Sequence, residues 1–167
     1  MRFDAVKVQV KNGDGMRHLM SVLDALEQSE IQVGWFNTKS TIRSDDKEDT
    51  GAYDAYKAVA NEFGNPSSKG RRRPPRPFIF QNMEKVADEV ISSLQNNREL
   101  KASNVRDAFK KGAERGANQI RENIDSVFSP KLSKLTVKLR GNGSTKPLID
   151  TGSMRKNVKG KVVRKKQ

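Results

Sequence analysis

The sequence predicts an α+β fold in which a small, mainly antiparallel sheet is covered by about three helices, with a projecting arm rich in proline and arginine. Apolar and polar residues alternate in three short stretches, at 3–10, 30–37 and 157–163, which is the period of half-buried strands. Between these stretches, apolar residues recur every three or four positions, as in amphipathic helices. We therefore expect a single domain over residues 1–163, which includes the arm at 64–77, followed by a basic C-terminal end at 164–167.

The N-terminal part is expected to form a strand, a helix and a second strand. The strand at 3–10 carries its valines on one face, and a turn leads into a helix over 16–26. The second strand ends in an aromatic pair, Trp35 and Phe36, which we expect to pack under a helix. His18 is the only histidine, so we interpret it as a surface residue rather than as part of a metal site.

Residues 45–49 form the one dense acidic run of the sequence. A metal-dependent nuclease needs clustered carboxylates on a rigid frame, whereas this run lies in a predicted loop with Lys47 in its middle. We interpret it as a solvated loop, with weak calcium binding and pairing with a basic neighbour as the alternatives.

A further helix is predicted over 53–63, with Gly64 as its C-terminal stop. Its apolar stripe is made by Tyr53, Tyr56, Val59, Ala60 and Phe63. Aromatic residues among basic ones can stack on nucleic-acid bases, but a stripe at helical spacing is typical of a core. We expect this stripe to be buried.

The arm at 64–77 holds four of the six prolines of the chain. Proline fixes its own φ and favours an extended residue before it, so residues 73–77 should form a stiff, polyproline-like rod. The rod should hold four arginines away from the body of the protein, with Phe78, Ile79 and Phe80 anchoring its far end. The arginines are Arg71, Arg72, Arg73 and Arg76. The alternative is a disordered, solvated run of charge.

Two helices are predicted after the arm, at 80–96 and from Ser103-Asn104 to Val127. The middle of the second helix has only small residues on one side: Gly112, Ala113, Gly116 and Ala117. Glycine in a helix interior costs about 1 kcal/mol relative to alanine, so we expect a close packing partner. That partner is either the helix at 80–96 or a neighbouring subunit.

The C-terminal part is less determined by its pattern. Ser129-Pro130 suits the start of a helix, but Leu135, Val137 and Leu139 fit a strand equally well. Residues 141–144 form a turn, and residues 153–156 a turn or a single helical turn. The triplet at 150–152, Asp-Thr-Gly, also occurs in aspartic proteases, but those enzymes need two carboxylates that share a proton, and this chain has one such triplet in a lysine-rich setting.

Length and composition restrict the class of protein. The chain has 167 residues, of which 34% are hydrophobic, so its core is of limited size and part of its stability should come from assembly with other subunits. No apolar run approaches the about 18 residues of a membrane span, and no secretory leader is seen. The absence of cysteine excludes disulfides and thiolate chemistry, which fits synthesis in a reducing cytoplasm.

The net charge of +13 is concentrated near the C-terminus, because residues 131–167 contain 12 Lys or Arg and one acid. Such a segment attracts anionic partners through counterion release and long-range steering. Nucleic acid and an acidic protein surface are the natural candidates, and the basic residues from 156 onward are candidate contacts to DNA phosphates, without reading of sequence; otherwise they only keep the chain soluble. They are Lys156, Lys159, Lys161, Arg164, Lys165 and Lys166.

Four short motifs, taken in order, resemble the virion-morphogenesis family of tailed bacteriophages. They are Val33-Gly34-Trp35-Phe36, the helix segment 56–64, Pro75-Arg76-Pro77-Phe78, and residues 147–155. The resemblance covers residues 31–163. The chain departs from the family pattern in its Arg-Arg-Arg-Pro-Pro segment at 71–75 and in its basic tail.

The resemblance implies a structural role in the virion, without catalysis, cofactor, metal or small-molecule substrate. A protein of this family would form a homo-oligomeric ring, of six copies, at the neck or the head-proximal end of the tail. There it would complete or terminate the tail and join it to the head connector, with genomic DNA passing its lumen. The four arm arginines would then clamp a neighbouring subunit, because guanidinium groups pair carboxylates bidentately, and Phe78 and Phe80 would seat the clamp. The alternative function is a stand-alone, sequence-nonspecific nucleic-acid-binding protein.

Overall fold

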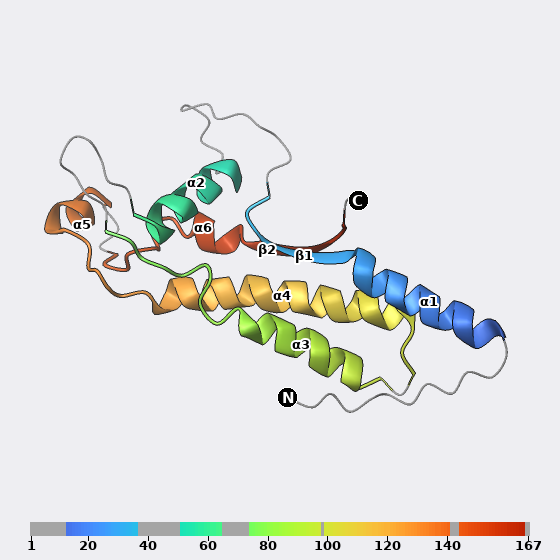
Figure 1. Ribbon diagram of the computed structural model, residues 1–167. Coiled ribbons are helices and arrows are strands. Elements are labelled where there is room, and N and C mark those ends of the chain that lie inside the picture. The colour runs from blue at the N-terminus through green and yellow to red at the C-terminus, as the bar shows by residue number, and fades with distance from the viewer. Residues whose placement is uncertain (1–12, 37–50, 65–73, 98, 141–143, 166–167) are drawn as a thin grey trace.

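The computed structural model describes residues 13–36, 51–64, 74–97, 99–140 and 144–165 of the chain (Figure 1). These residues form an α+β fold with six helices and a two-stranded antiparallel sheet, which confirms the predicted fold class. In chain order the elements are α1 (Gly13–Gln28), β1 (Ser29–Gly34), α2 (Gly51–Glu62), α3 (Glu84–Gln95), α4 (Ala102–Ser126), α5 (Lys134–Arg140), α6 (Ser153–Lys156) and β2 (Lys159–Arg164). No helix in these ranges is long and apolar enough to cross a membrane.

The sheet joins the two predicted strands that fall within the described residues, one near each end of the described chain. β1 and β2 pair from Ser29 with Arg164 to Gly34 with Lys159. The backbone N–H of Lys165 then donates to the carbonyl oxygen of Gln28 at 2.7 Å. The predicted strand at 3–10 lies outside the described residues.

Helix α4 is the central element of the fold. Figure 1 shows it running between α3 on one side and the sheet on the other, with α1 near its N-terminal end and α6 near its C-terminal end. Its small residues explain this arrangement. A Cβ atom on Gly112 would lie 2.4 Å from Cγ2 of Val90 in α3, and one on Gly116 would lie 2.6 Å from Cγ2 of Val33 in β1. The predicted close partner is therefore α3, together with the sheet of the same chain.

The closest approach is that of β2 to α4. A Cβ atom added to Gly160 would lie 1.9 Å from the carbonyl oxygen of Ala113. Real Cβ atoms do not come this close to backbone oxygen, so only glycine fits at this position. The strand backbone thus rests directly on the helix backbone, and the neighbouring residues of the strand are placed by this contact.

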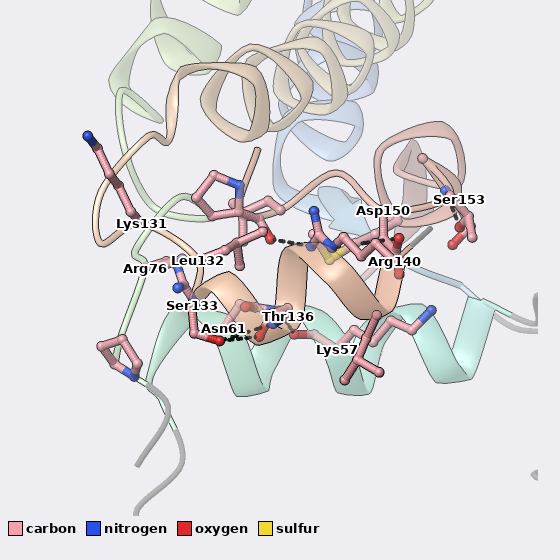
Figure 2. A pocket seen from close by; sticks show the side chains of 17 residues that line it. Lys57, Asn61, Arg76, Lys131, Leu132, Ser133, Thr136, Arg140, Asp150 and Ser153 are labelled. Atoms are coloured by element: carbon pink, nitrogen blue, oxygen red, sulfur yellow. Dashed lines mark hydrogen bonds and ion pairs between the residues drawn. The ribbon is translucent and has the colours of Figure 1, made fainter. Parts of the chain in front are cut away.

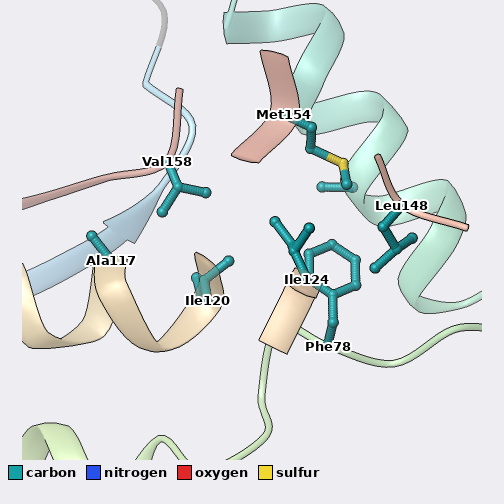
Figure 3. Close-up of a cluster of buried hydrophobic side chains, with 8 residues drawn as sticks. Phe78, Ala117, Ile120, Ile124, Leu148, Met154 and Val158 are labelled. Atoms are coloured by element: carbon teal, nitrogen blue, oxygen red, sulfur yellow. The ribbon is translucent and has the colours of Figure 1, made fainter. Parts of the chain in front are cut away.

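The main hydrophobic core gathers around the C-terminal half of α4 (Figure 3). Its buried members are Ala58, Phe78, Ala117, Ile120, Ile124, Leu148, Met154 and Val158. Trp35 packs against this cluster with its ring edge-on to Phe78, at 6.3 Å between centroids, and its Nε1–H donates to the carbonyl oxygen of Met154 at 2.7 Å. The end of β1 is therefore attached to α6, as well as to the core.

A smaller cluster of Val22, Ala25 and Val105 joins α1 to α4. The helix expected at 16–26 is confirmed, but most of its apolar stripe is not buried, because Met16, Met20 and Leu23 are 55%, 60% and 49% exposed. His18 is exposed as expected, and its Nε2 lies 2.8 Å from the carbonyl oxygen of Leu100.

The starts of α3 and α5 differ most from those predicted. Helix α3 begins at Glu84 instead of Phe80, after Asn82 with a left-handed φ of 56°. The segment after Ser129-Pro130 is a helix rather than a strand, but it begins at Lys134, because the Ser133 hydroxyl accepts the N–H of Thr136 at 3.1 Å. In both cases a local backbone or capping interaction sets the first turn.

The contact between β2 and α4 gives a stability prediction. Gly160→Ala should lower the free energy of unfolding by about 3 kcal/mol, since the added methyl group meets backbone and not a movable side chain. Thermal unfolding followed by circular dichroism measures the loss. Lys159→Ala, the neighbouring exposed position, is the control and should change stability by less than about 0.5 kcal/mol. Equal stability of the Gly160 variant and the parent would contradict the packing described.

Candidate functional site

Helix α2 buries the side that was expected to face solvent, so it is rotated about its own axis relative to the prediction. Tyr56, Val59 and Phe63, expected in the core, are 66%, 54% and 67% exposed. The buried side of the helix carries Asp54 and Glu62 instead, which are 0% and 6% exposed and lie one helical turn on either side of Ala58. The prediction that these three residues are buried is therefore wrong; Ala60 is half-buried, and the Tyr53 side chain lies outside the part of the chain that the structure describes. Polar partners of the two carboxylates are the reason.

Asp54 fastens α2 to α6. Its Oδ1 accepts the hydroxyl of Ser153 at 2.9 Å, and its Oδ2 accepts the side-chain amide of Asn157 at 2.7 Å. Lys57 adds an ion pair at 3.8 Å to the same carboxylate. A buried carboxylate is tolerated only with such partners, so Asp54 must face α6.

Glu62 fastens the other end of α2 to the chain after the arm. Its Oε2 accepts the backbone N–H groups of Phe78 at 2.7 Å and of Ile79 at 2.9 Å. One residue earlier in the helix, the carbonyl oxygen of Asn61 accepts the backbone N–H of Arg76 at 2.7 Å. These bonds hold residues 76–79 along the C-terminal end of α2.

A second polar chain holds the same segment from the side of α4. The side-chain amide of Asn123 donates to the carbonyl oxygens of Phe78 and Gln81, both at 2.8 Å. Gln119 in turn donates to Asn123 at 2.9 Å, and both side chains are buried. Sequence reasoning missed Asp54, Glu62, Gln119 and Asn123, because polar residues on a helix are usually solvated and nothing in the pattern names their partners.

The described end of the arm does not project. Arg76 is only 7% exposed, and its Nε–H donates to the carbonyl oxygen of Pro130 at 3.0 Å, so the expectation that the rod holds it away from the body is wrong. Burial lowers the pKa of the Arg76 guanidinium, and the nearby charge of Arg140 lowers it further. The three other arm arginines, Arg71, Arg72 and Arg73, lie outside the described residues.

The two phenylalanines after the arm have different positions. Phe78 is fully buried in the main core, as an anchor should be. Phe80 is 69% exposed and does not seat the arm, contrary to expectation. The hydrogen bonds from Glu62 and Asn123 fix the backbone around Phe78, and they leave the Phe80 side chain on the surface.

Arg76 lies at a pocket of about 630 Å³ (Figure 2). The pocket is bounded by α2, the end of the arm, α5 with the residues before it, and the segment 147–154. Among the described residues, four basic side chains line it against one acid; they are Lys57, Arg76, Lys131 and Arg140, with Asp150 as the acid. The hydroxyls of Ser133 and Thr136 and the apolar side chains of Leu132 and Leu139 complete one wall.

Arg140 organises the segment that closes the pocket. Its Nη1 donates to the carbonyl oxygens of Lys146 at 2.7 Å and Ile149 at 2.9 Å, and its Nη2 donates to that of Pro147 at 3.1 Å. Asp150 forms an ion pair with its Nε at 3.6 Å. The Arg140 guanidinium is therefore already used for folding.

The basic C-terminal residues lie on the surface. The five that are described are exposed: Lys156, Lys159, Lys161, Arg164 and Lys165. Lys159 and Lys161 are on the face of the sheet directed away from α4, because Gly160 between them faces that helix. Lys161 places its ammonium 4.0 Å from the centre of the Phe36 ring. Lys166 lies outside the described residues.

Comparison with known proteins gives no relative: no protein-family model, no curated protein and no solved structure matches the chain.

The role of Glu62 can be tested by mutation. Glu62→Ala should lower the free energy of unfolding by about 3 kcal/mol, because the buried N–H of Phe78 and the partly buried N–H of Ile79 lose a charged acceptor. Urea unfolding followed by circular dichroism measures the change. Glu27→Ala, at an exposed position of α1, is the control and should stay within about 0.5 kcal/mol of the parent. Similar values for both variants would contradict the anchoring role of Glu62.

Proposed function

We propose that the chain is a structural virion protein of the neck or tail of a tailed phage, which assembles into a homo-oligomeric ring that completes the tail and joins it to the head connector. The motif resemblance in the sequence supports this family. The structure adds an independent reason to expect assembly, namely the exposed apolar stripe of α2, and that stripe carries the proposal.

The stripe is defined by Tyr56, Val59 and Phe63. Each helical residue turns by about 100°, so these side chains lie roughly opposite to Asp54 and Glu62, which face the interior. Single exposed apolar residues need no explanation, but a row of them on one helix marks an interaction surface. A neighbouring subunit or a tail protein that covered the stripe would remove this apolar area from water.

The basic strand β2 fits the same proposal. Lys159 and Lys161 are exposed together on one face of the sheet, and lysine on a strand discourages unwanted pairing of its edge. In a ring, this face would be suited to lie near genomic DNA, with contacts to phosphates only. The same exposed lysines favour the second candidate, a stand-alone, sequence-nonspecific nucleic-acid-binding protein.

Light scattering separates the two candidates. A ring held by apolar contacts should keep one discrete oligomeric mass at low salt and at about 0.5 M salt, since apolar association is not screened. A nucleic-acid binder should stay monomeric, bind DNA at low salt and lose it steeply as the salt rises. That second outcome would overturn the proposal, and immunogold labelling of assembled particles at the neck would add to the first.

The stripe itself is tested by the double variant Tyr56→Ser and Phe63→Ser. We expect a large loss of the oligomeric mass with an unchanged circular dichroism spectrum, because both side chains are exposed in the single chain. Ile91→Ser, at an equally apolar position of α3 that is 50% exposed, serves as the matched control and should keep the oligomer. Dissociation of the control alone would place the interface on α3 instead.

A further inference from the structure

The pocket beside α2 holds a positive charge that the described residues leave unbalanced. Arg140 has Asp150 and three carbonyl oxygens as partners. Arg76 donates only through its Nε and its backbone N–H, and no carboxylate within the described ranges forms an ion pair with it. Its terminal guanidinium nitrogens are therefore available at the pocket, next to a second guanidinium.

The surroundings of Arg76 suit a carboxylate. A guanidinium presents a planar fork that pairs both oxygens of a carboxylate. Lys131, which is exposed at the rim, adds a second positive charge, and the hydroxyls of Ser133 and Thr136 add hydrogen-bonding groups. Leu132 and Leu139 line the same space and would contact the methylene groups of an acidic side chain.

A peptide fits this pocket better than a nucleic-acid backbone does. Arg76 is 93% buried by the chain around it, given an exposed fraction of 7%. A phosphodiester chain meets basic residues most readily on an open surface, and the lysines of β2 provide such a surface elsewhere. A single side chain, by contrast, can reach into a recess of about 630 Å³.

From this charge complementarity we propose that the pocket binds an acidic peptide segment, and that the occupant is the acidic run 45–49 of a second copy of the chain. This run is the densest group of carboxylates in the sequence, with four acids in five positions. The inference rests on the proposed self-assembly and gives it a polar contact in addition to the apolar one on α2.

The test uses a fluorescently labelled synthetic peptide of residues 44–50 and the full chain. In that chain Asp45, Asp46 and Asp49 are changed to Asn and Glu48 to Gln, so that its own run cannot compete. Fluorescence anisotropy should show saturable binding that weakens as salt is added. A peptide with the same Asn and Gln replacements should not bind. Equal binding of both peptides would overturn the proposal.

Pocket variants locate the contact. Arg76→Ala should lower the affinity for the peptide at least about tenfold, as expected for loss of a charge-assisted hydrogen-bond pair. Because Arg76 also holds Pro130, Lys131→Glu provides a second test at an exposed position and should weaken binding by about the same factor. Lys138→Glu on α5, outside the pocket lining, is the matched control. Equal weakening by Lys131→Glu and Lys138→Glu would show non-specific attraction and overturn the pocket assignment.

The two proposals fail in different ways. If the parent chain keeps its ring mass but the peptide does not bind, only the pocket inference is wrong. If the parent chain is monomeric at all salts, the proposed assembly is wrong whatever the peptide does. If the peptide does not bind and Lys131→Glu weakens the binding of an oligonucleotide, the pocket is assigned to nucleic acid instead.

Discussion

The fold depends on how closely other backbones approach α4. Its small residues let α3 lie on one side and the sheet on the other, and Gly160 of β2 rests on the backbone of Ala113. Interiors are packed to crystal density, so a side chain at such a contact has no room to relax. This single constraint brings together a strand from the N-terminal part and a strand from the C-terminal part, and the pairing of β1 with β2 follows.

The second determinant is a set of buried polar bonds that fix α2 and the chain around it. Asp54 connects the helix to α6, and Glu62 connects it to the backbone at Phe78. Buried hydrogen bonds are directional, whereas apolar contacts are not. The two carboxylates therefore select one rotation of α2 about its axis. In that rotation the apolar stripe faces outward and Arg76 comes to lie at the pocket.

The sequence predicted what depends on local period and missed what depends on distant partners. Alternation identified β1 and β2, and spacing identified α1 to α4 and the side of α4 that carries only small residues. The rotation of α2 about its axis, which decides which side is buried, was not predictable in this way. Its apolar side looks like a core face, and the partners that bury Asp54 lie 99 and 103 residues away along the chain.

The prediction of where Arg76 lies was wrong for the same reason. Proline restricts the backbone of the segment before Phe78, but its described residues are placed by bonds to Asn61, Glu62 and Pro130. Stiffness sets the shape of a segment and not the surface on which it lies. The pocket could not have been found from sequence, since its basic residues come from three segments that are far apart along the chain: α2, the end of the arm, and α5 with the residues before it.

In the proposed assembly, the buried arginine would link folding to association. A guanidinium stays charged at neutral pH even where burial and a neighbouring cation lower its pKa, because its ordinary pKa is far above the working range. Within the described ranges, Arg76 is thus a desolvated charge near Arg140 and forms no ion pair with a carboxylate, which is unfavourable. The apolar stripe of α2 is in the same situation, exposed to water until it is covered. The stripe and the pocket-lining residues Lys57 and Asn61 lie on different sides of α2. Under the proposed assembly, separate contacts on two sides of this helix would therefore relieve the two costs.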